Sequence, residues 1–483
     1  MAATFYWHDY ETWGADPRRD RPCQFAGLRT DADFNPVGAP LVLYCRPALD
    51  LLPQPEACLI TGITPQLADA KGLIEAEFTA AIAQELSVPG TCGVGYNSFR
   101  FDDEVTRHIF YRNLLDPYAR EWQNGNSRWD LIDILRLAQA LRPEGIVWPL
   151  REDGSASFRL EDLTAANAIP HAGAHDALAD VQATIALARL LRRAQPRLYD
   201  YALRLRDKRE VRAMLEKGEP LVHASARFPA ALGCIAPIVA VAPHPSNGNG
   251  VICFDLRAEP DLLLDLSVEE LRRRLFTPSA QLPDGVERIP LKTVQVNHAP
   301  VLAPLKTLTG VAAARWSIDP AEVLRRAQTV RDKAAAIRER VQAVHQPAPD
   351  GANAQTVSDP DLMLYSGGFL SDADRRTLER VRRLPPADLA TANPRFADAR
   401  LPEMLFRYRA RNWPEVLSPE EREEWDAWRL TRLTDPQGGG SIQLEQYEAQ
   451  LEALSETQAA VPAKRQLIKD LAAWAERLMD AAD

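Results

Sequence analysis

One short run near the N-terminus, Thr4–Thr12, constrains this chain more than any other stretch. It alternates bulky apolar and aromatic residues, which is typical of a strand in a buried sheet. Two carboxylates, Asp9 and Glu11, stand at its end. Because side chains two residues apart on a strand share one face, these carboxylates converge, and a hard divalent cation is the usual means of relieving their repulsion. The alternative is a polar strand end that runs into a loop, and this run alone does not decide between the two.

The chain is long enough for two or three domains, since 483 residues exceed one ordinary core. Its 46% hydrophobic and 26% charged residues are typical of a globular protein. We find no apolar run long enough to span a bilayer and no signal-peptide pattern, so we expect a cytoplasmic protein without a membrane partner. A monomer is the default expectation.

Charge and cysteine content narrow the class further. The formal net charge of −10 argues mildly against a protein that coats nucleic acid without specificity, although it is compatible with a local basic groove. The cysteines are scattered and form no C-x-x-C pair, which favours reduced, mostly buried thiols over a zinc site or a disulfide framework. They are Cys23, Cys45, Cys58, Cys92, Cys234 and Cys253.

Strands and helices alternate over residues 1–195, which predicts an α/β domain with a mixed sheet. The expected strands cover residues 4–12, 24–30, 41–45 and 91–96. Thr64 followed by Pro65 predicts the start of a helix that carries Phe78, Ile82 and Leu86. Further helices are expected at 104–113, 128–141, 160–168 and from just after His175 to about Arg193.

From about Leu198 the pattern changes to short β-branched segments separated by Pro, Gly and Asn. This predicts a small antiparallel barrel or sandwich. Its segments cover 221–228, 234–242, 250–256 and 287–301, with a helix at 268–276 and a long helix at about 320–344. Gln346–Gln355 predicts a linker, and helices are expected beyond it at 372–384, 403–411, 419–432 and 443–479.

Two further acidic positions recur at element ends of the first domain. Asp102 opens a helix after the loop that begins at Tyr96, and Asp180 lies little more than a turn inside the helix that follows His175. Taken singly, Asp102 is equally well explained as an acid that complements a helix dipole, and His175 as a loop histidine. At a helix N-terminus the imidazolium form is disfavoured, so His175 would stay neutral and able to accept a proton.

The four carboxylates carry more weight together than apart. Convergence of four acids would be strongly destabilising unless metal ions bridge them. Two Mg²⁺ or Mn²⁺ ions suit in-line attack of water on a phosphodiester, and a neutral histidine beside that water is a natural general base. The pattern therefore predicts a two-metal nuclease with Asp9, Glu11, Asp102, Asp180 and His175 at its centre.

The order D-x-E, then Asp in a strand–helix loop that contains Asn, then H-x4-D resembles the DEDDh group of 3′→5′ exonucleases. The fuller strings select one branch, because they are similar to the bacterial exonuclease I family: His8–Thr12, Gly95–Glu104, Asn126–Asp130 and Ser157–Leu160. The resemblance covers nearly the whole chain. It implies a ribonuclease H-like exonuclease domain over 1–195, an SH3-like β domain over 196–346 and an all-α domain over 356–483.

Residue roles follow from the resemblance. It implies that Asp9, Glu11, Asp102 and Asp180 bind metal, that His175 is the catalytic base, and that Glu11 also contacts the terminal nucleotide. Arginines suit phosphates and aromatic faces suit stacked bases of a single strand. The expected substrate contacts are Glu11, Thr12, Arg107, Tyr118, Trp122, Arg136 and Arg159. For the Tyr and Trp the alternative is a core position, and for the arginines a solvated surface.

A protein partner is also implied. The family binds the acidic C-terminal tail of the single-stranded-DNA-binding protein, and the matching region here holds Tyr201 and a basic helix with Arg325, Arg326, Arg331 and Arg338. Such arginines could hold the carboxylates of the tail, although a solvated helix face is the alternative. Glu219 stands in a shortened segment where the family pattern has a basic residue, so this segment departs from the family pattern.

The resemblance thus implies a Mg²⁺-dependent enzyme that removes 5′-mononucleotides from the 3′ end of single-stranded DNA, processively, with a role in DNA repair and recombination. One alternative is a DEDDh exoribonuclease, since the acids do not distinguish the sugars. A second is a non-catalytic single-strand-binding protein on a nuclease fold, which predicts a missing acid or His175. A third, a proofreading subunit, requires a polymerase-binding segment that we cannot identify.

Overall fold

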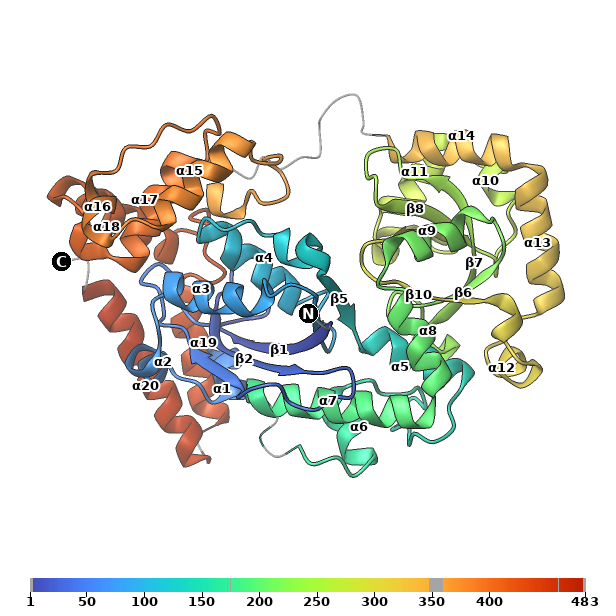
Figure 1. The fold of residues 1–483 in the computed structure, drawn as a ribbon, viewed down its shortest axis with the longest axis horizontal. Helices are drawn as coiled ribbons and strands as arrows, with labels where there is room; N and C mark the ends of the chain where they lie inside the picture. The colour runs from blue at the N-terminus through green and yellow to red at the C-terminus, as the bar shows by residue number, and fades with distance from the viewer. Residues whose placement is uncertain (1–2, 172, 174, 347–358, 459, 481–483) are drawn as a thin grey trace. The chain divides into compact units, whose positions relative to one another are not determined.

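The computed structural model describes residues 3–171, 173, 175–346, 359–458 and 460–480 (Figure 1). The chain divides into two compact units. The first comprises Met1–Ser127, Ala172–Gln182 and Gln355–Asp483, and the second comprises Arg128–His171 and Ala183–Ala354. The N-terminal and C-terminal parts of the chain therefore share one unit.

A mixed sheet forms the centre of the first unit. Its strand order is β3-β2-β1-β4-β5, and β1 (Thr4–Thr12) pairs antiparallel with β2 (Pro22–Thr30) and parallel with β4 (Thr91–Gly95). The outer strands are β3 (Leu41–Tyr44) and β5 (Ser127–Asp130). All of β3 belongs to this unit, whereas β5 contributes only Ser127 to it. Aromatic residues such as Tyr6 and Trp7 are buried on both faces of β1, which explains its apolar pattern.

The helices of the first unit begin with α1 (Pro55–Thr61), α2 (Pro65–Lys71), α3 (Glu75–Leu86) and α4 (Asp102–Arg112). The prediction of a single helix from Pro65 to Leu86 was wrong, although Thr64 does cap α2 by accepting the N–H of Leu67 at 3.1 Å. Helix α2 ends before Gly72, where a Cβ would lie 2.3 Å from the carbonyl oxygen of Ala68 and 2.6 Å from the backbone nitrogen of Arg46. Only glycine fits this close approach to the end of β3.

The C-terminal part of the first unit is helical. It contains α15 (Asp372–Arg382), α16 (Pro386–Thr391), α17 (Leu401–Asn412), α18 (Pro419–Thr434), α19 (Leu444–Thr457) and α20 (Pro462–Asp480). The single helix expected at 443–479 is two helices, because Pro462 lacks the N–H that a continuing helix requires. Helices α19 and α20 lie beside α1 and α2 (Figure 1), where Leu471 and Trp474 share a buried cluster with Trp13.

Buried ion pairs join these helices to the N-terminal part of the same unit. Asp50 is fully buried, and its two carboxylate oxygens accept hydrogen bonds from Nη1 and Nη2 of Arg21, each at 2.6 Å. Arg411 of α17 also reaches Asp50, at 3.0 Å, and continues to Asp361 at 2.5 Å. Burial raises the pKa of Asp50, but Arg21 and Arg411 outweigh it and hold that pKa well below its ordinary value.

The second unit is built on a separate antiparallel sheet with the order β10-β6-β7-β8-β9. Its strands are β6 (Leu221–Ala224), β7 (Ile235–Pro243), β8 (Gly250–Asp255), β9 (Leu291–Gln295) and β10 (Val301–Pro304). The segment expected at 287–301 is therefore two strands, separated by a turn in which Ala299 has a φ of 40°. The helix expected at 268–276 is confirmed as α11 (Val268–Phe276), capped by Ser267.

The second unit also contains helices. They are α5 (Ile132–Leu141), α6 (Leu160–Ala166), α7 (Ala177–Ala194) from Ala183 onward, α8 (Pro196–Arg204), α9 (Lys208–Glu216), α10 (Leu262–Asp265), α12 (Gly310–Arg315), α13 (Pro320–Asp332) and α14 (Ala334–His345). The helix expected at 128–141 begins only at Ile132, because β5 occupies the first positions and Asp130 accepts the N–H of Ile132. The long helix expected at 320–344 is interrupted at Lys333, whose ammonium group pairs with Asp261 at 2.6 Å.

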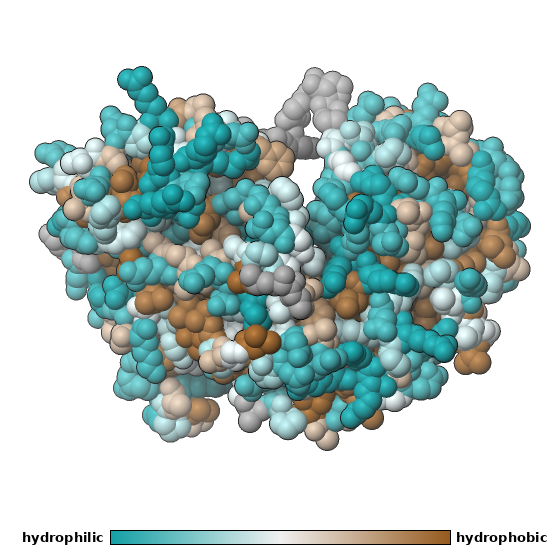
Figure 2. All heavy atoms as spheres, viewed as in Figure 1, coloured by the Kyte–Doolittle hydropathy of each residue, from teal (hydrophilic) through white to brown (hydrophobic). Residues whose placement is uncertain are grey.

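Three further expectations concern the chain as a whole. All six cysteines are buried and free, as predicted. The expected linker Gln346–Gln355 lies outside the described residues after Gln346. Among the described residues, no helix has both the length and the apolar composition that crossing a bilayer requires. On the face drawn in Figure 2, hydrophilic residues predominate and hydrophobic ones appear in small groups.

A buried histidine on α4 makes stability depend on pH. His108 is 1% exposed, and neither ring nitrogen has a hydrogen-bond partner among the described residues. Burial, followed by the charges of Arg112, Arg18 and Arg107, lowers its pKa to about 3. Between this value and about 6.5 the unfolded chain binds a proton that the folded chain does not, so the free energy of unfolding falls as pH falls.

Replacing His108 with leucine should remove this dependence. At about pH 5 the wild type should have lost roughly 2 kcal/mol of unfolding free energy relative to neutral pH through this group, whereas His108→Leu should not have lost that share. Urea unfolding of both proteins at the two pH values measures the difference. Equal acid sensitivity of the two proteins would contradict the assignment.

Candidate metal and active site

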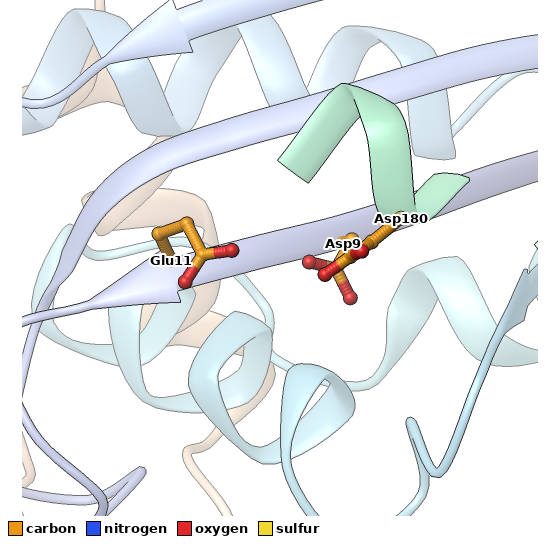
Figure 3. Close-up of side chains that lie close together, drawn as sticks. All are labelled: Asp9, Glu11 and Asp180. Atoms are coloured by element: carbon orange, nitrogen blue, oxygen red, sulfur yellow. The ribbon is translucent and has the colours of Figure 1, made fainter. Parts of the chain in front are cut away.

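Three carboxylates meet at the end of β1. Asp9 and Glu11 come from β1, and Asp180 comes from the first turn of α7. One ligand oxygen from each lies within 4.8 Å of the others. Figure 3 shows Asp9 and Asp180 pointing toward one another, with Glu11 nearer the strand end. The register of β1 against β2 shifts between Glu11 and Thr12, so the strand is irregular where the site begins.

The electrostatics of this cluster favour a bound cation. Burial, then Asp102, Glu11 and Asp180, raise the pKa of Asp9 well above its ordinary value. Burial, then Asp180 and Asp176, raise the pKa of Glu11 to about 8. Carboxylates that oppose one another's ionisation are stabilised by a hard divalent cation, whose preferred ligands are carboxylate oxygens. The donor set therefore fits a divalent metal ion.

Asp102 lies next to this cluster as the first residue of α4. It is 3% exposed, and its Oδ1 accepts the backbone N–H of Tyr10 at 3.1 Å. That bond ties the start of α4 to β1 between the two carboxylates of the strand. Among the described residues, Asp102 is outside the group of three whose ligand atoms all lie within 4.8 Å.

His175 directly precedes the capped start of α7. Its side chain is exposed, and its φ of 69° places it in the left-handed region that non-glycine residues seldom adopt. Such a conformation persists where the surrounding structure enforces it, and it is common at functional sites. His175 therefore lies in a turn that leads directly into α7.

Two residues near the site were missed by sequence reasoning. Asp176 is a fifth carboxylate, since it contributes to the raised pKa of both Asp9 and Glu11. Gln24, on β2, is 1% exposed and bonds to the start of α7. Asp176 stands beside His175 in the sequence, which is a signal that could have been used. Gln24 carries no such signal.

The expected substrate contacts in the first unit differ in how far their side chains are buried and in whether they already have partners. Thr12 is buried and donates its hydroxyl to the carbonyl of Gly14 at 2.6 Å. Arg107 is buried and pairs with Glu104 and Glu121, each at 2.7 Å. The ring of Tyr118 lies under Arg107 and meets Phe369 edge-on at 6.0 Å between centroids. Trp122 is 66% exposed.

The other expected contacts belong to the second unit. Arg136 is 8% exposed, pairs with Asp133 and lies over the ring of Phe158, whereas Arg159 is exposed at the start of α6. The half-buried Tyr201 donates its hydroxyl to the carbonyl of Leu302 at 2.9 Å.

The expected basic helix corresponds to α13 and α14, on which Arg331 and Arg338 respectively are exposed. Arg325 and Arg326 both pair with Glu259, at 2.6 and 2.8 Å. Glu219 is exposed.

Metal addition provides a direct check of the cluster. Mg²⁺ or Mn²⁺ should raise the unfolding temperature of the protein relative to a sample held in a chelator, because a ligand of the folded state stabilises it. At a hundredfold excess over the dissociation constant the gain is about 2.7 kcal/mol. Thermal unfolding followed by circular dichroism measures it. An unfolding temperature that does not respond to either ion would count against a metal site.

Family models match three consecutive parts of the chain. The model described as exonuclease matches residues 6–188, the exonuclease I SH3-like domain matches 206–347, and the exonuclease I C-terminal domain matches 358–478. With the mixed sheet, the second antiparallel sheet and the C-terminal helices, these matches confirm the predicted fold class.

Whole-chain relatives agree with these matches. Exodeoxyribonuclease I of Escherichia coli K12 is 45% identical over 479 residues, which cover 99% of this chain and 98% of the relative. A solved exonuclease I from Methylocaldum szegediense is 52% identical with a TM-score of 0.94, and E. coli exonuclease I in complex with a dA16 oligonucleotide is 45% identical with a TM-score of 0.92. Each structure match covers 99% of this chain and 100% of the other. The chain belongs to the exonuclease I family.

Proposed function

We propose that this protein is an exodeoxyribonuclease that hydrolyses single-stranded DNA from its 3′ end and releases 5′-mononucleotides. The observation that carries the proposal is the cluster of Asp9, Glu11 and Asp180, whose oxygens lie within 4.8 Å of one another at the end of β1. Membership of the exonuclease I family and the oligonucleotide bound by the E. coli relative support DNA as the substrate.

The residues divide the work between them. Asp9, Glu11, Asp102 and Asp180 would hold two Mg²⁺ ions, or Mn²⁺, which supply positive charge that stabilises the reacting phosphate. His175 takes the proton of the attacking water as the general base. Glu11, at the strand end, also contacts the terminal nucleotide.

The rest of the strand is bound by arginines and aromatic rings. Trp122 is exposed and offers a face for a base, and Tyr118, which packs against Phe369, is the second aromatic ring for a base. Arg159 is exposed and suited to a phosphate. Arg107 and Arg136 would contact the DNA while they remain paired with Glu104 and Asp133. Thr12 would contact it through its backbone, since its hydroxyl already donates to the carbonyl of Gly14.

The remaining assignments are also proposals. We propose domain limits of 1–195, 196–346 and 356–483, and processive action. Tyr201, Arg331 and Arg338 are proposed to bind the acidic C-terminal tail of the single-stranded-DNA-binding protein; the exposed guanidinium groups suit carboxylates. Action in DNA repair, a cytoplasmic location and a monomeric state complete the proposal.

The function is tested by the release of label from DNA. Oligodeoxynucleotides that carry a label at the 3′ end or at the 5′ end are incubated with the protein in Mg²⁺ or in chelator, with matched RNA and duplex controls. Immediate release of the 3′ label as a mononucleotide, only with metal, is the expected result. Initial loss of the 5′ label, or preferred attack on RNA, would overturn the proposed direction or substrate.

A further inference from the structure

Gln24 connects β2 to the helix that carries Asp180. It is 1% exposed and lies directly opposite Glu11 in the register of β1 and β2. Residues directly opposite one another in an antiparallel pair share a face, and so do residues two apart on a strand. The side chain of Gln24 therefore lies on the same face of the sheet as Asp9 and Glu11.

Both ends of the Gln24 amide bond to the start of α7. Its Oε1 accepts the backbone N–H of Ala177 at 3.1 Å, and its Nε2 donates to Oδ2 of Asp176 at 3.4 Å. The other oxygen of Asp176 accepts the N–H of Ala179 at 3.2 Å. The first N–H groups of a helix have no partner within it, so these contacts satisfy two of them and anchor the helix end to β2.

The anchored residues stand between the two groups that the reaction requires from this segment. His175 directly precedes Asp176, with its left-handed φ of 69°, and Asp180 follows Ala177 by less than one turn. Figure 3 shows this first part of α7 beside β1, with Asp180 next to Asp9. A shift of the helix end would therefore displace Asp180 from Asp9 and alter the turn at His175.

We propose that Gln24 is a positioning residue, which fixes His175 and Asp180 against the carboxylates of β1 by anchoring Asp176 and Ala177. The inference rests on the proposed function for the roles of His175 and Asp180. The competing explanation is a buried amide that only contributes to stability. In that case its loss should lower the unfolding temperature and leave the site unchanged in the folded protein.

The test compares four proteins well below their unfolding temperatures. They are the wild type, Gln24→Met, the double variant Gln24→Glu with Asp176→Asn, and Gln139→Met. Methionine keeps the size of glutamine but removes both hydrogen bonds. The double variant exchanges the amide and the carboxylate, so it keeps the net charge and restores a donor–acceptor pair. Gln139, which is 2% exposed on α5, is the matched buried glutamine.

Three quantities are measured: kcat and KM on single-stranded oligodeoxynucleotides, the dissociation constant of Mn²⁺ by calorimetry, and amide hydrogen exchange over residues 176–182. Gln24→Met should lower kcat and weaken Mn²⁺ binding about 10–100-fold, with KM for DNA changed less than about twofold, because groups that orient metal ligands have effects of this size. Amide exchange over residues 176–182 should become faster. In the double variant, kcat, Mn²⁺ affinity and the exchange rate should return most of the way to the wild-type values. Gln139→Met should match the wild type.

Wild-type kcat, Mn²⁺ affinity and exchange in Gln24→Met would overturn the inference, as would a loss of equal size in Gln139→Met. If Gln24→Met does not fold, the double variant alone decides: near wild-type values of all three quantities support anchoring, and wild-type kcat and Mn²⁺ affinity despite faster exchange over residues 176–182 contradict it. If the wild type itself releases no nucleotides, the proposed function fails, while Mn²⁺ binding and exchange still judge the role of Gln24.

Discussion

Asp9→Asn should abolish nucleotide release and at the same time stabilise the metal-free protein. Removing one carboxylate from the cluster of three removes a proposed metal ligand, and loss of several kcal/mol of charge stabilisation corresponds to a fall in kcat of about a thousandfold. Burial and neighbouring acids raise the pKa of Asp9, so its charge is unfavourable in the folded protein without metal. An uncharged amide should raise the unfolding free energy of the metal-free protein by about 1–3 kcal/mol.

The two effects are measured separately. Release of the 3′ label gives kcat, and urea unfolding in chelator gives the stability. Addition of Mg²⁺ should stabilise the variant less than the wild type, because the variant has lost a ligand. Asp33→Asn, at an exposed turn in the same unit, is the control and should change neither quantity. Substantial activity in Asp9→Asn, or a less stable metal-free variant, would argue against a metal role for this carboxylate.

Asp50→Asn should destabilise the first unit by about 3–5 kcal/mol. Asp50 is fully buried and is shared by Arg21 and Arg411, so its neutralisation leaves two buried guanidinium groups without their common partner. The loss concerns the packing of the C-terminal helices on the N-terminal part of this unit, since Arg411 belongs to α17. Burial raises the pKa of Asp50, but the pairing with Arg21 and Arg411 outweighs it and holds that pKa low, which indicates the same dependence on its charge.

Urea unfolding at neutral pH measures this loss. Glu379→Gln is the matched control, because Glu379 pairs with Arg383 on the exposed face of α15 and such pairs contribute about 0.5 kcal/mol or less. A loss in Asp50→Asn as small as in this control would show that the buried network contributes little.

The sequence by itself determined the elements that depend on local pattern. The alternation in Thr4–Thr12 requires a buried strand, and the spacing of Asp9 and Glu11 places both on one face of it. Thr64 and Ser267 specify helix starts because a side-chain oxygen satisfies a free N–H close by. The recurrence of acids at strand ends and helix starts, together with the family strings, was enough to predict the fold class.

The tertiary structure decided what depends on contacts between distant parts of the chain. Arg107 donates a hydrogen bond to the hydroxyl of Tyr365, 258 positions away in the sequence. Gln24 accepts one from the backbone N–H of Ala177, 153 positions away. No periodicity in the sequence indicates that Arg107 is held between two glutamates or that Gln24 anchors a helix. The break at Gly72 likewise follows from a neighbouring strand end and not from the helical pattern around it.

The sharing of one unit by the two ends of the chain has the same origin. The C-terminal helices read as an independent helical segment, because each has its own apolar face. Their partner surface, with Trp13 and Asp50, appears only when the N-terminal part of the chain has folded. Hydrophobic and ionic contacts act through space, so local sequence pattern fixes the strand, the acids and the helix caps, while packing alone selects their partners.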